Sequence, residues 1–381
     1  MVAGEASGDA LGSHLIAALR QHLPQAKFVG IGGPKMLAAG FDSWFQQEAL
    51  AVRGIVEVVR HYPKIKGIRD KLTKMLLADP PDMFVGIDAP DFNLGLEKRL
   101  KTAGITTVHY VSPTIWAWRP GRIQSIRQAV SHMLVLFPFE EPLYRDAGIP
   151  VTFVGHPLAD TIGEDSDRAS MRAQLRLPAD GKIIALLPGS RQSELEYLSD
   201  LFIATAKLIL QSLPQCRFLV PLATRETRAL FEAALYRHNA TDPPFAPLFG
   251  HAQDAIVAAD AVLVASGTAT LEAALLRRPM IIAYRLSPIT YAIARHLVHT
   301  RWVGLPNVLA GDYVVPEFLQ DDATPANLAQ AMVNLLADEY VLKELPKRFD
   351  AMHRVLKRNA AERAAAALLP LLATMQKRRQ G

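Results

Sequence analysis

The chain has 381 residues, which is enough for two ordinary domains. Half of the residues are apolar and 21% are charged, a balance that excludes a disordered chain. The net charge of +5 is spread along the sequence without a basic–aromatic binding module, so we expect no nucleic-acid partner. The only cysteine is Cys216, which excludes an internal disulfide and favours a reducing compartment.

The first residues, MVAGEASGDA, have neither the basic nor the apolar region of a secretory signal, so we expect a cytoplasmic protein. The longest apolar runs, such as 364–375, fall short of the roughly 20 residues that a membrane-spanning helix needs. These features favour a protein that is soluble or bound at a membrane surface.

Short β-branched runs alternate with helical patterns along the chain. The predicted strands are 27–31, 83–87, 105–111, 133–137, 151–154, 182–187, 216–221, 261–265 and 280–284. Such an alternation predicts parallel sheets with helices on both faces. A polar stretch at 160–180 separates two series, so we predict an α/β fold of two doubly wound, Rossmann-like domains over 1–160 and 161–345. Residues 346–381 are predicted as C-terminal helices that pack back on the first domain or exchange in a dimer.

The N-terminal stretch VAGEASGD is typical of a strand that runs into a phosphate-type turn and a helix at 11–22. Only Val2 and Ala3 belong to the strand before this turn. Either the strand is very short or the start lies downstream of the natural one.

The segment 53–77 mixes apolar and basic residues in a helical pattern. A basic amphipathic helix suits an anionic membrane surface, although an ordinary helix with one solvated face has a similar pattern. The residues predicted to face the membrane are Ile55, Val56, Val59, Ile65 and Ile68.

Asp88 follows directly on the predicted strand in FVGIDAPDFN, and Asp91 comes three residues later. Ligands of parallel sheets bind at the carboxyl ends of strands, where a partly buried carboxylate can act as a general base. We favour this role for Asp88 over a helix cap. For Asp91, which precedes an apolar-periodic segment, the pattern favours the cap.

The stretch HYVSPTIWAWRPGR (109–122) brings aromatic and basic side chains into one loop. Such a group suits a sugar or a phosphate-bearing acceptor, and a packing loop between domains is the serious alternative. The candidates from this loop for the acceptor side or the cleft are His109, Trp116, Trp118 and Arg119, and Asp91 is a further candidate there.

Two strand-to-helix turns in the second half favour an anionic ligand. LLPGSR ends a strand with Gly189, Ser190 and Arg191, whose backbone N–H groups and guanidinium suit a phosphate. ASGTATLE supplies a close backbone approach, hydroxyl groups and one acid, although a capping box explains part of this pattern. Together the turns predict a nucleotide diphosphate. The residues of the second turn are Ser266, Gly267, Thr268, Thr270 and Glu272.

Several common sites have no counterpart in this sequence. It contains no G-x-x-x-x-G-K-[ST] loop, no H-E-x-x-H zinc motif and no G-x-S-x-G elbow. We therefore expect chemistry that needs neither a metal nor a cofactor.

Seven motifs together resemble the lipid-A-disaccharide synthase family, in order and along nearly the whole chain. They are GEASGD (4–9), FVGIDAPDFN (84–93), HYVSPTIWAWR (109–119), GHPLAD (155–160), LLPGSR (186–191), ASGTATLE (265–272) and LPNVLAG (305–311). The resemblance implies a GT-B glycosyltransferase that inverts the anomeric centre without a metal.

The implied reaction moves diacylated glucosamine from UDP-2,3-diacylglucosamine to the 6-hydroxyl of 2,3-diacylglucosamine 1-phosphate (lipid X). The products are UDP and the β-1,6-linked disaccharide 1-phosphate of lipid A. The resemblance also implies a peripheral enzyme on the cytoplasmic face of the inner membrane, bound to an anionic surface. A homodimer that exchanges its C-terminal helices is implied as well.

The same resemblance gives the candidate residues their roles. Arg191 is expected to stabilise the departing diphosphate, and Glu272 to bind the ribose hydroxyls. Asn307 in LPN is expected at the donor site, and Ser7 and Gly8 near the cleft floor. Asp88 is expected to deprotonate the acceptor, with His109 as the alternative base.

Two rival interpretations stay open at this stage. A non-hydrolysing UDP-sugar 2-epimerase shares the fold and the nucleotide turns. A non-catalytic scaffold at the membrane surface is the other, but it gives no reason for two anion-binding turns beside a carboxylate.

Overall fold

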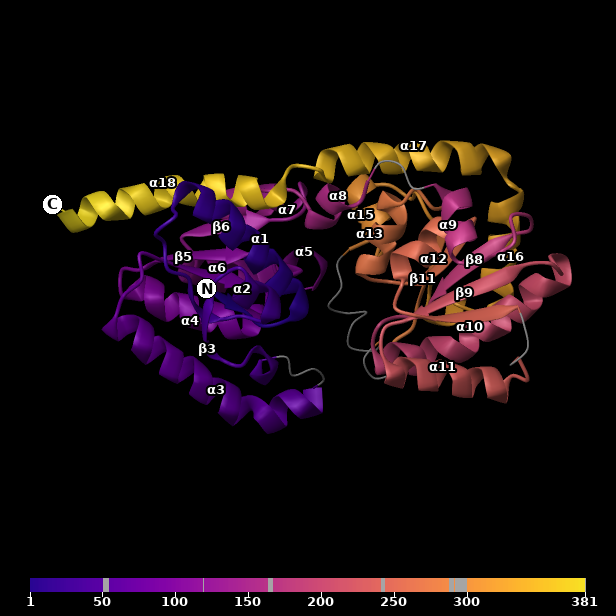
Figure 1. Cartoon of the computed structure of the whole chain (residues 1–381), viewed down its shortest axis with the longest axis horizontal. Helices are drawn as coiled ribbons and strands as arrows, with labels where there is room; N and C mark the ends of the chain where they lie inside the picture. The colour runs from indigo at the N-terminus through magenta and orange to yellow at the C-terminus, as the bar shows by residue number, and fades with distance from the viewer. Residues whose placement is uncertain are drawn as a thin grey trace. The chain divides into compact units, whose positions relative to one another are not determined.

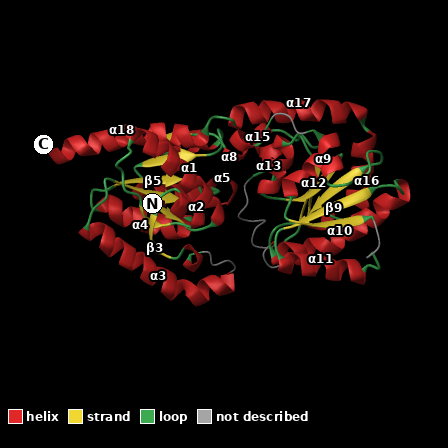
Figure 2. Ribbon diagram, viewed as in Figure 1, coloured by secondary structure: helices red, strands yellow, loops and turns green. Residues whose placement is uncertain are grey.

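The computed structural model describes residues 1–50, 55–118, 120–163, 167–240, 244–287, 291 and 300–380. It divides into two compact units, Met1–Asp160 with Leu356–Gly381 and Thr161–Val355. Each unit is built on a parallel sheet with helices on its faces (Figures 1 and 2). Within the described ranges no helix is both long and apolar enough to cross a bilayer.

The described strands of unit 1 form a seven-stranded sheet in the order β3-β2-β1-β4-β5-β6-β7. The strands are β1 Val2–Ala3, β2 Val29–Ile31, β3 Asp42–Phe45, β4 Met83–Ile87, β5 Thr106–Tyr110, β6 His132–Val135 and β7 Val151–Phe153. The helices are α1 Ala6–His22, α2 Pro34–Ala38, α3 Ile55–Ala78, α4 Pro90–Thr102, α5 Ile115–Trp118, α6 Ile123–Ala129, α7 Glu140–Asp146, α8 Pro157–Thr161 and α18 Ala360–Gln380.

The first strand is only two residues long, yet it lies in the middle of this sheet. Val2 and Ala3 are fully buried, and β1 pairs in parallel with both β2 and β4. The two apolar residues before the GEASGD turn therefore form a strand.

Apolar side chains cover both faces of the unit 1 sheet. On one face, Leu15 and Ile16 of α1 join Ala364 and Leu368 of α18 in one buried cluster. On the other face, side chains of α3 and α4 form a second cluster with Phe84 of β4. The last helix therefore completes the core of the first unit (Figure 1).

The start of α18 is fixed by a residue of the GHPLAD motif. The Asp160 carboxylate accepts hydrogen bonds from the backbone N–H groups of Arg358, Asn359 and Ala360 at 3.0, 2.9 and 2.7 Å. A carboxylate at a helix N-terminus satisfies N–H groups that have no partner inside the helix. This motif therefore anchors the returning chain to unit 1.

The described strands of unit 2 form a six-stranded sheet in the order β10-β9-β8-β11-β12-β13. The strands are β8 Ile183–Leu187, β9 Arg217–Leu222, β10 Phe245–Phe249, β11 Ala261–Ala265, β12 Met280–Tyr284 and β13 Glu317–Leu319. The helices are α9 Arg168–Gln174, α10 Gln192–Ser212, α11 Arg225–Arg237, α12 Ala252–Ala258, α13 Thr268–Leu275, α15 Leu305–Ala310, α16 Pro325–Ala337 and α17 Glu339–Leu356.

Alternate residues of the central strands divide this core between two faces. Ile184 and Leu186 of β8 pack with Phe202 of α10, Phe231 of α11 and Met332 of α16. Ile183 and Leu187 alternate with them and are also buried. The buried runs that predicted parallel strands thus belong to a sheet covered on both faces.

Each predicted strand is present within two residues of its expected bounds. The structure adds β3, β10 and β13, which the sequence pattern did not predict, and all three lie at sheet edges. The C-terminal part of the chain forms three helices, α16 to α18.

Candidate functional site

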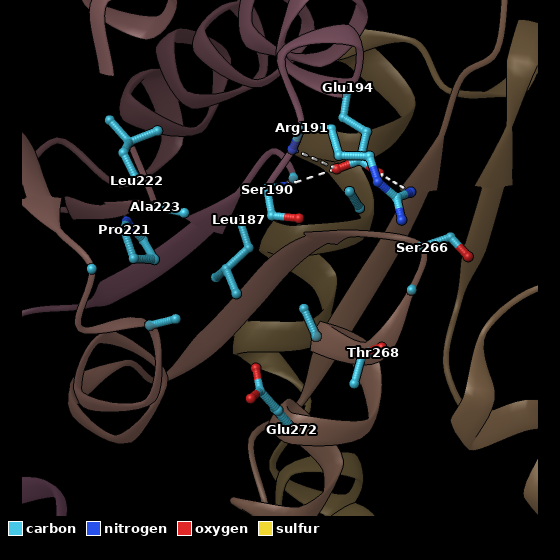
Figure 3. Close-up of a pocket in the computed structure, with 16 residues that line it drawn as sticks. Leu187, Ser190, Arg191, Glu194, Pro221, Leu222, Ala223, Ser266, Thr268 and Glu272 are labelled. Carbon is cyan, nitrogen blue, oxygen red and sulfur yellow. Dashed lines mark hydrogen bonds and ion pairs between the residues drawn. The ribbon is translucent and has the colours of Figure 1, made fainter. Parts of the chain in front are cut away.

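The clearest candidate site in the described residues is a pocket of about 350 Å³ in unit 2. It lies at the carboxyl ends of β8 and β11, where ligands of parallel sheets bind (Figure 3). Its lining comes from four strand-to-helix turns and comprises Leu187, Gly189, Ser190, Arg191, Glu194, Pro221, Leu222, Ala223, Gly250, Ala252, Ala265, Ser266, Gly267, Thr268, Ala269 and Glu272. Both predicted anion turns therefore open into the same pocket.

The first turn joins β8 to α10 and has a conformation that favours glycine. Gly189 has φ +123°, and a Cβ atom there would lie 2.3 Å from Oε2 of Glu194. Arg191 is the N-cap residue of α10, and its side chain is 58% exposed. The turn thus presents N–H groups and a guanidinium at the start of a helix, as an anion site requires.

The donors of this turn already bind one carboxylate. Oε2 of Glu194 accepts hydrogen bonds from the backbone N–H groups of Ser190 at 2.8 Å and Arg191 at 3.2 Å. Oε1 of Glu194 lies 3.2 Å from the Arg191 guanidinium (Figure 3). Glu194 thus places a negative charge on the donors that the sequence assigns to a phosphate. Glu194 was not among the predicted site residues, although a Glu at the third helical position commonly reaches back to the N–H of the N-cap residue.

The second turn joins β11 to α13. Gly267 is the N-cap residue with φ +142°, and no atom lies within 4 Å of a Cβ built there. Ser266 donates to the Val303 carbonyl at 3.2 Å, and Thr268 begins the helix. Glu272 lies one turn further and lines the pocket, and burial raises the pKa of its carboxyl.

Two predicted donor residues do not line this pocket. Thr270 is fully buried and donates to the Gly267 carbonyl at 2.7 Å, within its own turn. Asn307 is also fully buried, and its amide bonds to the backbone of Val314 and Val315 and to Glu317. The hydrogen bonds of both side chains stabilise the backbone of unit 2 and do not point to a ligand.

Asp88 in unit 1 ends β4 in an unusual backbone conformation. Asp88 and Ala89 have φ +54° and +44°, which is the left-handed region that residues with side chains rarely adopt. The GEASGD turn packs against this point, because a Cβ on Gly4 would lie 2.7 Å from Cβ of Ala89. Strained residues at strand ends are typical of functional sites.

The predicted cleft residues Ser7 and Gly8 lie in the first turn of α1. Ser7 is exposed, and a Cβ on Gly8 would lie 3.3 Å from the Ile87 carbonyl oxygen. Both residues therefore belong to the edge of the sheet that carries Asp88.

His109 is not a cleft residue, contrary to the prediction. It is fully buried on β5, and its Nδ1 lies 2.7 Å from Oε1 of Glu97, which is also fully buried. A proton acceptor for a substrate must reach that substrate. In this structure His109 is placed to contact Glu97, and its role as the alternative base stays a prediction.

The prediction that Asp91 caps a helix is also wrong. The N-cap residue of α4 is Ala89, and the side chain of Asp91 is 87% exposed. Its Oδ1 forms an ion pair with Arg122 at 2.5 Å, which ties α4 to the loop after β5.

The aromatic loop divides into described and undescribed parts. The ring of Trp116 packs edge-on against Phe139, with centroids 5.2 Å apart. This contact lies within unit 1, so it is not the packing between domains that the alternative describes. The side chains of Trp118 and Arg119 lie outside the described residues.

The predicted membrane face of α3 is only partly described. Ile65 and Ile68 are partly buried and pack against the core of unit 1. The side chains of Ile55, Val56 and Val59 lie outside the described residues. Among the described side chains of this helix, the exposed large apolar ones are Tyr62, Met75 and Leu77.

Comparisons with known proteins identify the family of the chain. A family model described as lipid-A-disaccharide synthetase matches residues 1–368. A lipid-A-disaccharide synthase of Aromatoleum aromaticum is 57% identical over 372 residues, covering 98% of this chain and 95% of that protein.

Solved structures show the same fold at low identity. WaaG, a glycosyltransferase involved in lipopolysaccharide biosynthesis, has a TM-score of 0.56 at 12% identity and covers 96% of each chain. A UDP-GlcNAc 2-epimerase from Neisseria meningitidis bound to UDP-GlcNAc has a TM-score of 0.57 at 12% identity, covering 96% of this chain and 97% of that chain. These two likenesses concern the two-domain GT-B architecture alone. The family match over nearly the whole sequence is far more specific, and the chain belongs to the lipid-A-disaccharide synthetase family.

Proposed function

We propose that this protein transfers 2,3-diacylglucosamine from UDP to the 6-hydroxyl of 2,3-diacylglucosamine 1-phosphate. The products are UDP and the β-1,6-linked disaccharide 1-phosphate. The observation that carries the proposal is the convergence of two helix-start turns on one pocket, in a chain of this family.

The first part of the mechanism concerns the donor. The diphosphate of UDP binds the N–H groups of Ser190 and Arg191, and the Arg191 guanidinium stabilises the negative charge that grows on the leaving phosphate. Glu272 accepts hydrogen bonds from the ribose hydroxyls. The pocket supports this assignment because these groups line it from two different turns.

The second part concerns the acceptor. The Asp88 carboxylate takes the proton of the acceptor 6-hydroxyl while the oxygen of that hydroxyl bonds to the anomeric carbon of the donor sugar. The bond from that carbon to the β-phosphate oxygen breaks, and the electron pair leaves with UDP. Attack from the opposite side inverts the anomeric centre. The strained backbone of Asp88 at a strand end supports this role.

The protein also acts at a membrane, because both sugar substrates carry acyl chains. In α3 the exposed apolar residues accompany four exposed lysines, Lys64, Lys66, Lys71 and Lys74. Such a surface suits the anionic cytoplasmic face of the inner membrane. The proposal includes a homodimer in which the two subunits exchange α18, so that each α18 packs on unit 1 of the partner subunit.

The test is a transfer assay in mixed micelles of detergent and phospholipid. We expect UDP release only when both lipid substrates are present, with one disaccharide formed per UDP by mass spectrometry. Formation of an epimerised UDP-sugar without UDP release would contradict the proposal. A rate of UDP release that is the same with and without the acceptor would contradict it as well.

A further inference from the structure

A group of buried polar side chains lies near the Asp88 turn in unit 1. It consists of Asn93 and Glu97 on α4 and His109 on β5, and all three side chains are fully buried. Buried polar groups cost free energy unless they are paired, and apolar side chains of similar size are often at least as stabilising. A need for stability alone is therefore a weak reason for three such residues at one place.

Asn93 bonds directly to the strained turn. Its Nδ2 donates to the backbone carbonyl of Asp88 at 2.8 Å and to that of Val2 at 3.3 Å. Since Val2 lies on β1 and Asp88 follows β4, one amide joins the ends of two neighbouring strands. Asn93 is the fourth residue of α4, which is too far into the helix for a capping role.

Asn93 bonds to a backbone segment, Asp88–Ala89, whose conformation is unfavourable by itself. A residue with a side chain in the left-handed region costs on the order of 1–3 kcal/mol, and such residues persist only where their surroundings enforce them. Asp88 and Ala89 are two in succession. The direction of the Asp88 side chain follows from this backbone, so the bond from Asn93 acts on that direction.

Glu97 lies one helical turn after Asn93 on α4 and pairs with His109 on β5. Gly86 pairs with His109 across the strands, and a Cβ on Gly86 would lie 2.1 Å from Oε1 of Glu97 and 3.0 Å from Cγ of Asn93. The missing side chain at Gly86 thus leaves room for Glu97 to reach His109. The backbone of Gly86 thus lies against both Asn93 and Glu97, which are one helical turn apart on α4.

We infer that Asn93 is a positioning residue for Asp88, acting through its hydrogen bond to the Asp88 backbone carbonyl. This inference rests on the proposed function, in which Asp88 is the base. Asn93 touches no reacting atom and acts through the conformation of the Asp88 turn.

The experiment measures kcat, both KM values and UDP affinity for Asn93→Ala and Asn93→Asp. The second variant keeps the shape of the side chain but lacks the two amide hydrogens. We expect kcat to fall on the order of 100-fold in both, because a misplaced base loses most of its effect. The KM for each lipid and the Kd for UDP stay near the wild-type values.

A matched control separates positioning from a loss of stability. Thr107 is fully buried on β5, and its hydroxyl donates to the Ala129 carbonyl at 2.7 Å. Thr107→Val removes a buried hydrogen bond in the same sheet but does not touch the Asp88 turn. We expect its kcat to stay within about twofold of wild type even if its melting temperature falls.

The decisive arm is the double variant Asp88→Ala with Asn93→Ala. If Asn93 acts through Asp88, the double variant is no slower than Asp88→Ala alone. An additional loss equal to that of Asn93→Ala in the wild-type background would overturn the inference. So would a wild-type kcat in both single Asn93 variants.

The same assay distinguishes this inference from the proposed function. Transfer that is lost in Asp88→Ala but intact in both Asn93 variants refutes the positioning role and leaves the transferase with its base. Near-normal transfer in Asp88→Ala refutes the base assignment, and the inference with it. Absence of acceptor-dependent UDP release in the wild type refutes the transferase itself.

Discussion

Replacement of Glu194 by Ala should tighten the binding of UDP. In the structure this carboxylate accepts hydrogen bonds from the N–H groups of Ser190 and Arg191 at 2.8 and 3.2 Å. The proposed diphosphate uses the same donors, so it has to displace the carboxylate before it can bind. Removal of Glu194 also removes one negative charge beside the ligand.

The size of the effect follows from the contact that UDP must break. Side-chain contacts of this kind at a helix start are worth about 1 kcal/mol. Since 1.4 kcal/mol is a factor of ten in affinity, the Kd for UDP should fall about fivefold in Glu194→Ala. The free energy of unfolding should fall by about 1 kcal/mol at the same time, because helix α10 loses its cap.

Isothermal titration of UDP into the wild type and the variants measures this directly. Glu194→Gln keeps the shape but removes the charge, so its Kd should lie between those of the wild type and Glu194→Ala. Glu232→Ala is a matched control, because Glu232 pairs with Arg228 on α11 and does not line the pocket. Weaker UDP binding in Glu194→Ala would refute the reasoning and would make the carboxylate a support of the site.

Three further predictions follow from single residues. Glu272→Ala should raise the Kd for UDP about tenfold, because the ribose loses hydrogen bonds to a charged group. The affinity for pyrophosphate should stay unchanged in the same titration. Asp160→Ala should lower the free energy of unfolding by about 1–2 kcal/mol in a denaturant titration, because the first N–H groups of α18 lose their acceptor. Burial raises the pKa of Glu140 from 4.5 to about 8, so its cost to folding is absent below pH 4.5 and grows as the pH rises toward 8. Glu140→Gln should therefore gain melting temperature over the wild type between pH 5 and pH 8, and a constant difference would contradict this.

The sequence pattern predicted the central strands well because they are buried on both faces. β4, β11 and β12 have the predicted bounds, and each is a short continuous apolar run. The strands that escaped prediction are β3, β10 and β13, at the edges of the two sheets. Edge strands are partly exposed, so their residues need not be apolar; β10 even contains Pro247.

The pocket was predictable for a local reason. The turns after β8 and β11 carry their glycines, hydroxyls and acids within a few residues, and the parallel sheet brings the ends of neighbouring strands together. Most residues of the two predicted turns line one pocket in the structure. Their role toward UDP stays a prediction.

Side-chain direction was the part that the sequence did not reveal. Adjacent residues on a strand point to opposite faces, and a histidine at the end of a strand can face the core or a ligand. Gly86 pairs with His109 on the neighbouring strand and leaves space for Glu97. His109 therefore contacts the buried Glu97 and faces the core. Sheet order and register supply that information, and one sequence alone does not.

The central claim is that UDP binding rests on Arg191 and proton removal on Asp88. The most direct measurement is acceptor-dependent UDP release by Arg191→Ala and Asp88→Ala, together with UDP titration of both. We predict that both variants lose release by orders of magnitude and that only Arg191→Ala loses UDP affinity. Near-normal release by Asp88→Ala, or unchanged UDP affinity in Arg191→Ala, would contradict the account.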